Sequence, residues 1–464
     1  MSLNIPEFRN LVVGQDKEVP LPDGAKRPYV NFDNAATTPP FNEVMKAIND
    51  FSGWYSSIHR GSGYKSLLST KIYHRCREIV ADFIGAGPSS IVIFCGNTTD
   101  AINRVCHRIH RDQDEVVLTT MMEHHSNQLP WRMCGNIDYV DVHDNGALNL
   151  EDLRFKLEKY GKRVKLVSVT GVSNITGVIN PLHDIAEMVH DYGAMILADL
   201  AQLIAHRPFS MGDPSDPRHI DFVAFSAHKM YAPFGSGVLV GPEDFFSDGP
   251  PAMSGGGVVE LVTLDDIIYT GLPEKEEAGS PNFFGVLALA KAAKVLQKIG
   301  MENVAAHDRE LTRYALKFLG EMPGIRIVGD DDPDFKQDRS GVIPILSDQY
   351  EHGLLASILG YEWGIGVRHG CFCAHTYLSR LFDLNLDNMA PYIKMVKEKR
   401  LNELPGLVRI SFGVYNSMEE LKYLEHAMKE IMKYGPRYNY VVNPDDGEYY
   451  PEERGGDIDL PFHL

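Results

Sequence analysis

The chain has 464 residues, more than one hydrophobic core usually supports, and its 44% hydrophobic and 23% charged residues are typical of a globular protein. Its formal net charge of -18 argues against nucleic acid or an anionic membrane as the main partner. No apolar run approaches the roughly 20 residues that span a bilayer, and residues 1–6 lack the basic and apolar segments of a secretory signal. The six scattered cysteines do not form a disulfide framework, so we expect a cytoplasmic protein.

Short apolar runs alternate with helical patterns between residues 90 and 241. The runs predict strands at 91–94, 115–118, 164–169, 194–197 and 222–225, with helices between them that include 150–160 and 182–191. This alternation indicates an α/β fold with a mainly parallel sheet and helices on both faces. Residues 235–241 follow at hairpin distance and predict one antiparallel strand. Active sites of such sheets gather at the carboxyl ends of the strands.

The pattern changes near residue 300. A glycine-rich loop at 254–257 is followed by a predicted helix from Phe284 to Ile299, and the strand and helix signals restart beyond Gly300. We therefore expect a large domain over residues 30–299 and a smaller α/β domain formed by residues 1–29 and 300–464. The tail from Pro436 is rich in Tyr, Pro, Gly and acidic residues, which predicts a surface extension.

A lysine stands where a buried strand should end. Lys229 follows the apolar run 222–225, and a buried ammonium costs several kcal/mol unless it is neutralised or paired. A lysine that forms a Schiff base with an aldehyde cofactor is one good reason for this placement. Asp199 ends the apolar strand 195–198 in the same way. A lysine for the aldehyde and an acid for the pyridine nitrogen are the two fixed points of a pyridoxal phosphate (PLP) site.

The segment 94–103 predicts a strand, a turn of small polar residues and the start of a helix. The amides at that helix start form an anion site, to which the hydroxyls of Thr98 and Thr99 add donors. The alternative is that a threonine simply caps the helix, and taken alone this alternative is favoured. Next to a lysine that binds PLP, a phosphate-binding role for these threonines becomes favoured over the helix cap. Ser226 and His228 flank the lysine and are further donors for the same phosphate.

Glu123-His124-His125 follows the strand that ends near residue 119. No HExxH pattern is present to supply zinc ligands. His124 is suited to lie against a cofactor ring and handle protons, or to be hydrogen-bonded in a loop for structure. The spacing alone does not choose between these roles.

Two further signals lie in the second half of the chain. A free cysteine is more often a small buried apolar residue than a nucleophile, but Cys373 lies in a loop with glycine, histidine and Arg368, where the thiolate is favoured. Cys371 and Cys373 resemble half a metal site whose other half is missing, so we expect a nucleophile and no metal. Arg409 lies within the apolar run 407–412, where an arginine meets a carboxylate. That carboxylate belongs either to a structural ion pair or to an amino-acid substrate.

Together these residues resemble the class V aminotransferase-fold family, and within it the SufS-like cysteine desulfurases and selenocysteine lyases. The order of the matching runs holds from about residue 30 to 420. The resemblance implies the PLP-dependent transferase fold type I, with a mainly parallel seven-stranded sheet between helices and a smaller α/β domain. The runs are Asn31–Ala36, His59–Gly61, Thr98–Asn103, Glu123–Asn127, Val172–Gly177, Asp199–Gln202, Ser226–Lys229, Glu277–Asn282, Arg368–Ala374 and Val408–Ser411.

The resemblance also implies a role for each matching residue. Lys229 would hold PLP and move the Cα proton, Asp199 would pair with the pyridine nitrogen, and Gln202 would bind the phenolic oxygen. His124 would stack on the ring, and Cys373 would take the substrate sulfur as a persulfide. The phosphate would be held by Thr98, Thr99, Ser226 and His228, with Ser280 from the other subunit of a homodimer. Asn174, Arg368 and Arg409 would hold the substrate, with Asn174 also near the cofactor.

The implied activity is that of a PLP-dependent cysteine desulfurase, which turns L-cysteine into L-alanine and passes the sulfur from Cys373 to a protein acceptor, and which also acts on selenocysteine in some relatives. The alternative is another class V enzyme, an aminotransferase, epimerase or C–S lyase, in which Cys373 is not essential. A sulfur carrier that binds PLP without turnover is disfavoured by the intact set of site residues.

Three features depart from the SufS-like pattern. Cys371 stands where many relatives have no thiol, and Gly370-Cys-Phe-Cys373 is also similar to molybdenum-cofactor sulfurases. Cys371 either relays sulfur or is inert. Ser280 replaces the usual threonine but keeps its hydroxyl. The segment 374–408 is longer than in the compact pattern, and its run 394–400 is either a solvated helix face or a docking surface for a sulfur acceptor.

Overall fold

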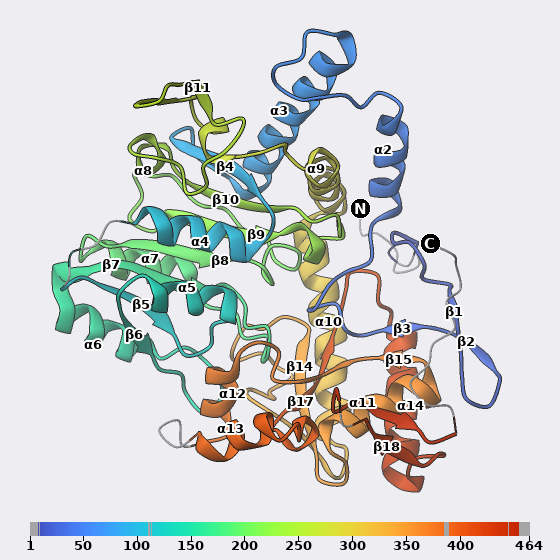
Figure 1. Ribbon diagram of the computed structural model, residues 1–464. Coiled ribbons are helices and arrows are strands. Elements are labelled where there is room, and N and C mark those ends of the chain that lie inside the picture. The colour runs from blue at the N-terminus through green and yellow to red at the C-terminus, as the bar shows by residue number, and fades with distance from the viewer. Residues whose placement is uncertain are drawn as a thin grey trace.

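The computed structural model describes residues 8, 10–109, 112, 114–384, 389–443 and 445–453 (Figure 1). Its largest element is a seven-stranded sheet in the order β4-β10-β9-β8-β7-β5-β6. The strands are β4 (Ser90–Cys95), β5 (Val116–Thr120), β6 (Asn136–Val140), β7 (Val164–Thr170), β8 (Met195–Asp199), β9 (Phe222–Ser226) and β10 (Gly237–Pro242).

The sheet is mainly parallel, as the alternation of strands and helices predicts. Strands β6, β5, β7, β8 and β9 pair in parallel, whereas β10 is antiparallel to both β9 and β4. The five predicted strands and the antiparallel strand are therefore confirmed. The edge strand β6 has no counterpart in the prediction, because the exposed Asn136 and the half-buried Asp138 interrupt any apolar run.

Helices cover both faces of this sheet, because successive strand residues point to opposite sides. Ile93, Leu197 and Phe222 lie in a core with α4 (Thr98–Arg108), α5 (Leu129–Met133) and α8 (Glu243–Ser247). Residues of the other face, such as Phe94 and Val223, pack with a second group of helices. These are α3 (Tyr64–Ile84), α6 (Leu150–Tyr160), α7 (Leu182–His190) and α9 (Phe283–Ile299).

A second hydrophobic core surrounds an antiparallel sheet of order β13-β14-β17-β16. Its strands are β13 (Ile325–Ile327), β14 (Val342–Ser347), β16 (Arg368–Gly370) and β17 (Leu407–Ser411), and its helices are α10 (Met301–Gly320), α11 (His352–Trp363) and α14 (Met418–Tyr434). Strand β3 (Val30–Asn31) pairs with β15 (Ile365–Gly366), which brings Phe32 into this core. The beginning of the chain thus packs with its second half.

The tail after α14 is not a bare surface extension, and that prediction is wrong in part. Strands β18 (Tyr440–Val442) and β19 (Tyr449–Pro451) form a hairpin that packs on α11. The hydroxyl of Tyr440 and the amide of Arg437 both donate to Glu362 of α11. Composition missed this packing because polar tyrosine contacts, rather than an apolar periodicity, hold the hairpin. Residues beyond 453 lie outside the described residues.

The long segment after Cys373 forms α12 (His375–Leu381), α13 (Ala390–Lys397) and the short turn η5 (Leu401–Glu403). The run 394–400 is largely exposed at the end of α13, as expected for a solvated helix face. A role in docking stays a prediction.

Two cysteines pair across helices. Cys106 in α4 and Cys134 at the end of α5 form a disulfide with their Cα atoms 6.4 Å apart, whereas Cys76, Cys95, Cys371 and Cys373 are free. The separation of 28 residues carries no signal of this pairing, which arises because α4 and α5 pack against each other. Within the described ranges, no helix has both the length and the apolar character needed to cross a membrane.

Candidate active site

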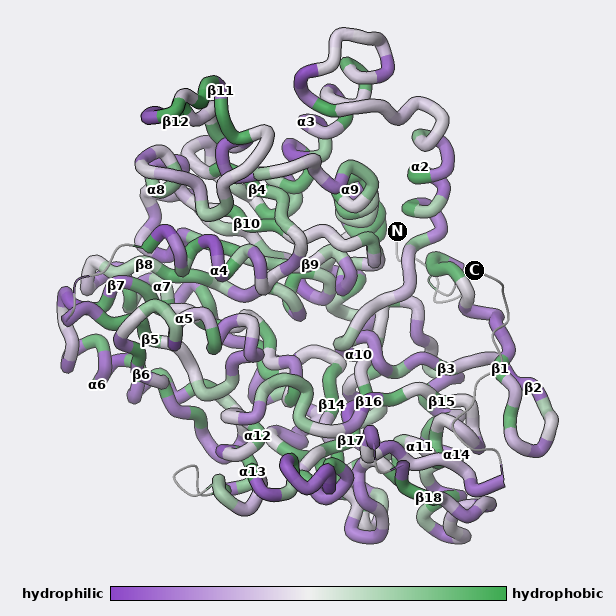
Figure 2. Tube along the Cα trace, in the orientation of Figure 1, coloured by the Kyte–Doolittle hydropathy of each residue, from purple (hydrophilic) through white to green (hydrophobic). Residues whose placement is uncertain are grey.

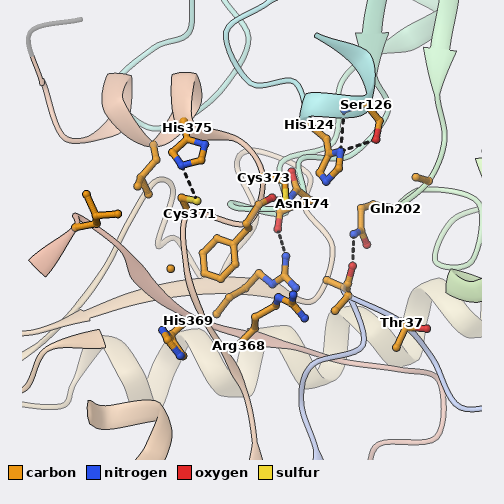
Figure 3. Close-up of a pocket in the computed structure, with 18 of the residues that line it drawn as sticks. Thr37, His124, Ser126, Asn174, Gln202, Arg368, His369, Cys371, Cys373 and His375 are labelled. Carbon is orange, nitrogen blue, oxygen red and sulfur yellow. Dashed lines mark hydrogen bonds between the residues drawn. The ribbon is translucent and has the colours of Figure 1, made fainter. Parts of the chain in front are cut away.

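A cavity of about 1190 Å³ lies at the carboxyl ends of the parallel strands (Figure 3). Residues of the seven-stranded sheet, of β16 and β17 and of the segment after Cys373 line it together. Every predicted site residue except Ser280 lines this cavity: Thr98, Thr99, His124, Asn174, Asp199, Gln202, Ser226, His228, Lys229, Arg368, Cys373 and Arg409. Ser280 is exposed elsewhere on the chain.

Lys229 and Asp199 extend from neighbouring strands. Asp199 is the last residue of β8, and Lys229 follows β9 in the single turn η3 (Ala227–Lys229). Within the part of the chain that the structure describes, Lys229 Nζ has no hydrogen bond or ion pair. Burial lowers the pKa of Lys229 to about 8, although the Asp199 carboxylate acts in the opposite direction. Burial also raises the pKa of Asp199. The amine is therefore partly neutral near physiological pH, as a nucleophile requires.

The start of α4 faces the cavity with several hydroxyl groups. Ser226 Oγ accepts from the Thr98 amide at 2.8 Å and lies 2.7 Å from Thr98 Oγ1, while Thr99 Oγ1 lies 2.6 Å from Ser126 Oγ. The helix is capped by Asn97, whose side chain accepts from the Asp100 amide. Threonine capping, the alternative considered from the sequence, is therefore wrong. Both threonines line the cavity, and their role in binding an anion at this helix start stays a prediction.

The two histidines predicted for the site, His124 and His228, are neutral. Burial lowers the pKa of His124 to about 3 and that of His228 to about 4, and the charge of Lys229 lowers both further. Nδ1 of His124 accepts from the Ser126 amide at 3.1 Å, so the proton of the neutral ring is on Nε2. A ring with so low a pKa does not change charge near neutral pH, which favours stacking over proton transfer as its role.

Two amide side chains brace the cavity wall. Gln202 Nε2 donates to the carbonyl of Ala35 at 2.7 Å, and Asn174 Nδ2 donates to the carbonyl of Phe372 at 2.8 Å (Figure 3). The backbone carbonyl of Asn174 in turn accepts from Arg409 Nη1 at 2.9 Å. Asn174 therefore joins the arginine to the loop that carries Cys373.

Arg409 is buried beside a second arginine. Its Nη2 donates to Asp33 Oδ1 at 3.1 Å, and Arg368 Nη1 lies 3.4 Å from Asp33 Oδ2. The Arg409 guanidinium also lies 4.6 Å from the centre of the Phe372 ring. The structural ion pair considered from the sequence is thus present. Two guanidinium groups share one carboxylate, however, which leaves positive charge at the cavity wall that suits a substrate carboxylate.

The loop with Cys373 has an unusual backbone. Phe372 and Cys373 have φ values of 53° and 55°, in the left-handed region that non-glycine residues rarely adopt. The Cys373 carbonyl accepts from the His125 amide at 2.8 Å, and the Asn174 bond holds the Phe372 carbonyl. Such strain persists only when surrounding contacts fix it, and it concentrates at functional sites. The Cys373 thiol is exposed.

Cys371 lies deeper in the same loop. Its Sγ is 3.1 Å from His375 Nε2 (Figure 3). Nδ1 of His375 is in turn 3.1 Å from His125 Nε2. Burial raises the pKa of Cys371. The sequence analysis singled out Cys371 but assigned no part to His125, because only the fold brings the two loops together.

Sequence reasoning also missed two acids. Asp33 lies within the matching run 31–36 but had no role assigned, and it is the shared partner of both arginines. Glu123, next to His124, is buried under the site and accepts from Thr120, Asn127 and the Thr170 amide. The matching runs contained both acids, and this was the only signal that pointed to them.

Residues 30–424 match the family model for class V aminotransferases. The chain belongs to the class V aminotransferase family. It is 34% identical to a cysteine desulfurase of Haloferax volcanii over 88% of this chain and 90% of the relative. It is 33% identical to a probable cysteine desulfurase of Mycolicibacterium paratuberculosis, but spans only 56% of that relative, and 63% of a similar one from Mycobacterium leprae.

Solved structures of this family have the same fold. A cysteine desulfurase from Thermococcus onnurineus in its apo form superposes with a TM-score of 0.79 at 30% identity, covering 93% of this chain and 99% of that chain. A cysteine desulfurase from Escherichia coli superposes with a TM-score of 0.76 at 25% identity over 93% of this chain and 99% of its own. The expected family and the expected fold type I are confirmed.

Proposed function

We propose that this protein is a PLP-dependent cysteine desulfurase that converts L-cysteine into L-alanine and transfers the sulfur to Cys373. The observation that carries the proposal is the exposed Cys373 thiol on the wall of the cavity that also contains Lys229 and Arg409. The three groups interact electrostatically, since the Cys373 thiolate raises the pKa of both Lys229 and Arg409. The names of the relatives support this assignment.

The cavity residues fit PLP. Lys229 Nζ lacks a partner in the described part of the chain, as suits an amine that holds the aldehyde, and Asp199 is placed on the neighbouring strand for the pyridine nitrogen. Thr98, Thr99 and Ser226 supply donors at the start of α4 for the phosphate. When bound, PLP supplies an electron sink for the α-carbon of an amino acid.

The chain's own residues would position the substrate and move its protons. Arg409 and Arg368 would bind the α-carboxylate, with Asn174 fixing the Arg409 side chain. Lys229, with a pKa of about 8, would accept the Cα proton in its neutral form. His124, neutral and held by Ser126, would stack on the ring rather than transfer protons.

Sulfur transfer then follows from the position of Cys373. The Cys373 thiolate attacks the sulfur of L-cysteine, an S–S bond forms, and the Cβ–S bond breaks. The electron pair of the broken bond stays with the Cβ side, which takes up a proton and leaves as L-alanine. The products are one alanine and one Cys373 persulfide, from which sulfur passes to an acceptor protein.

The decisive experiment compares two variants. Wild-type protein should absorb as a PLP protein and release alanine from L-cysteine. Cys373→Ala should keep the cofactor absorption and lose alanine release, whereas Lys229→Ala should lose both. Undiminished turnover in Cys373→Ala would instead favour an aminotransferase, epimerase or C–S lyase. Parallel assays with L-selenocysteine would show whether that substrate is also used.

We propose that the protein is a homodimer. The hairpin of β11 (Val259–Val262) and β12 (Ile267–Tyr269) is rich in apolar residues (Figure 2), and several of them are exposed, which supports an interface at this place. Its exposed members are Leu261, Val262, Leu264, Ile267 and Ile268. The Gly279 amide donates to Gly256 at the base of this hairpin, so the neighbouring Ser280 would reach the partner's cavity.

We also propose that residues 30–299 form a PLP domain and that residues 1–29 with 300–464 form the small domain. The presence of one core around each sheet supports this division, although Phe8 and Val12 pack in the core of the large sheet and Phe32 packs in the other core. The free thiols at the site support a location in the reducing cytoplasm, although a disulfide such as Cys106–Cys134 is uncommon there.

We propose the exposed end of α13 as the docking surface for the sulfur acceptor.

A further inference from the structure

Two histidines and an aspartate lie together near the amino ends of the strands, at the end of the sheet opposite the cavity. His190 ends α7, whereas His219 and Asp221 lie in the loop that leads into the amino end of β9. One nitrogen from each ring and one carboxylate oxygen all lie within 4.8 Å of one another. None of the three lines the active-site cavity. The cluster is therefore separate from the site described above.

The hydrogen bonds of the two rings fix where their protons are. Nδ1 of His190 is 2.6 Å from the carbonyl oxygen of Pro217, and Nδ1 of His219 is 2.6 Å from that of Asp216. A carbonyl oxygen can only accept, so each Nδ1 must carry a hydrogen. In a neutral imidazole, Nε2 then has a lone pair and no hydrogen.

Both of these Nε2 atoms face the same carboxylate. His190 Nε2 is 2.9 Å from Asp221 Oδ2, and His219 Nε2 is 3.2 Å from Asp221 Oδ1. Neutral rings would place lone pairs against oxygens that only accept, so a positive charge must lie between the nitrogens and the carboxylate. Either a proton on each Nε2 or one shared cation can supply it.

Protonation of both rings is the less favourable solution. The rings are stacked with their centres 4.3 Å apart and an angle of 22° between them, so two imidazolium charges would lie face to face. The hydrogen bond to Asp221 and the charge of Asp191 raise the pKa of His190, so a proton on that ring alone is the competing state. That state leaves the lone pair of His219 Nε2 facing Asp221 Oδ1 at 3.2 Å. The Asp221 carboxylate also accepts from the Ile196 amide at 2.8 Å. Arg218, the nearest arginine in the loop, pairs with Asp184 and stays outside the cluster.

We propose that His190, His219 and Asp221 bind a divalent transition metal, with Zn²⁺ as the preferred ion. Two imidazole nitrogens and a carboxylate are a donor set that zinc takes, with water as a fourth ligand. Zinc ligands at 2.0–2.1 Å in a tetrahedron lie about 3.3 Å apart, close to the nitrogen–oxygen distances here. A metal-binding histidine also commonly donates its other N–H to a backbone carbonyl, as both rings do here.

The ion would hold three segments together. It would join the end of α7, the loop 213–221 and the start of β9, near a surface where the three side chains are 12–21% exposed and can be reached by the ion. Because the site is at the amino ends of the strands, its role is structural, and desulfurase activity should not depend on it.

The test is a titration of full-length, PLP-loaded protein with Zn²⁺ after chelator treatment. All proteins carry Cys371→Ser and Cys373→Ser, so that the thiols of the cavity do not bind zinc. The reference protein should bind zinc and gain melting temperature, while His190→Gln and Asp221→Asn should each bind one equivalent less and lose that gain. His183→Gln is the matched control, because His183 lies on the same helix and bonds the same loop through Arg218, yet is outside the cluster.

Two readouts keep the proposal open to refutation if a variant folds poorly. Circular dichroism and PLP absorption report whether each variant is folded, and anomalous scattering at the zinc edge from crystals of the unsubstituted protein locates the ion directly. An anomalous peak between the three side chains supports the proposal. Equal zinc stoichiometry in all variants, or a crystal without that peak, would show that protons alone hold the cluster.

Discussion

Cys371 and Cys373 are two residues apart, but their surroundings differ in ways that separate their chemistry. Cys373 is exposed on a left-handed backbone and interacts with the charges of Lys229 and Arg409. Cys371 is half-buried and contacts His375, and burial raises its pKa. A thiolate is the form that attacks sulfur. The first persulfide should therefore form on Cys373.

Substitution of each cysteine by serine tests this order. Cys373→Ser should reduce alanine formation to background, whereas Cys371→Ser should keep most of the wild-type rate, because Cys371 is not the attacking group. Mass spectrometry of tryptic peptides after brief exposure to L-cysteine should find the extra sulfur on Cys373 first. Extra sulfur that is confined to Cys371 would reverse the assignment. Later appearance of sulfur on Cys371 would identify it as a relay.

The pKa of Lys229 predicts how the apoprotein captures its cofactor. Only the neutral amine attacks an aldehyde, and the pKa of about 8 means that its fraction rises as the pH increases through 8. The initial rate of PLP uptake, followed by absorbance, should therefore climb between about pH 6 and 9 and then level off.

Asp199 provides the control for this profile. Its carboxylate raises the pKa of Lys229, so Asp199→Asn should move the midpoint of PLP uptake to lower pH. An unmoved midpoint would show that the profile reports some other group. The variant should also hold PLP less tightly, because the partner proposed for the pyridine nitrogen has lost its charge.

At the scale of elements, one buried acid joins three segments of the large sheet region. Glu277 accepts from Arg77 of α3 at 2.8 and 3.1 Å, from the Tyr73 hydroxyl at 2.8 Å and from the Phe94 amide of β4 at 2.6 Å. It lies just before α9, so it ties that helix to α3 and to the edge strand. Removing it would leave the Arg77 charge buried without its partner.

Glu277→Gln should therefore lower the free energy of unfolding by about 3–5 kcal/mol, the usual cost of breaking a buried ion pair. The comparison is Glu43→Gln, whose carboxylate bridges Lys291 and Lys298 at the surface and should contribute at most about 1 kcal/mol. Urea unfolding of both variants measures the difference. Similar losses in the two variants would contradict a special role for the buried pair.

The sequence predicted the elements best where one physical signal dominated. The helix 150–160 and the strands of the sheet followed from apolar periodicity, and Lys229 and Asp199 followed from charge at the ends of buried strands. Contacts between distant segments had no such signal. The sharing of Asp33 by two arginines arises because the beginning of the chain lies beside β17. The contact of His125 with His375 arises because the loop after Cys373 packs against the loop after β5. The hairpin of the tail was missed because tyrosines and acids hold it.

For the whole molecule, the proposed dimer links an exposed surface to the active site. Several large apolar residues are exposed together on the hairpin β11–β12, and Leu264 at its turn is fully exposed at 103%. Its base contacts the segment of Ser280, the only predicted cofactor residue that is outside the cavity of its own chain. A dimer formed through this hairpin would therefore complete the phosphate site.

Leu264→Asp with Ile268→Asp should shift the protein from dimer to monomer, because two carboxylates would have to be buried in an apolar interface. Sedimentation velocity measures the mass, and PLP absorption after gel filtration measures cofactor retention, which should fall together with the dimer fraction. Phe155→Asp is the control, since Phe155 is 62% exposed on α6, away from the hairpin, and should leave both readouts unchanged. A variant that stays dimeric would place the interface elsewhere. A monomer with full PLP retention would instead remove Ser280 from the phosphate site, because no partner subunit would be present to supply it.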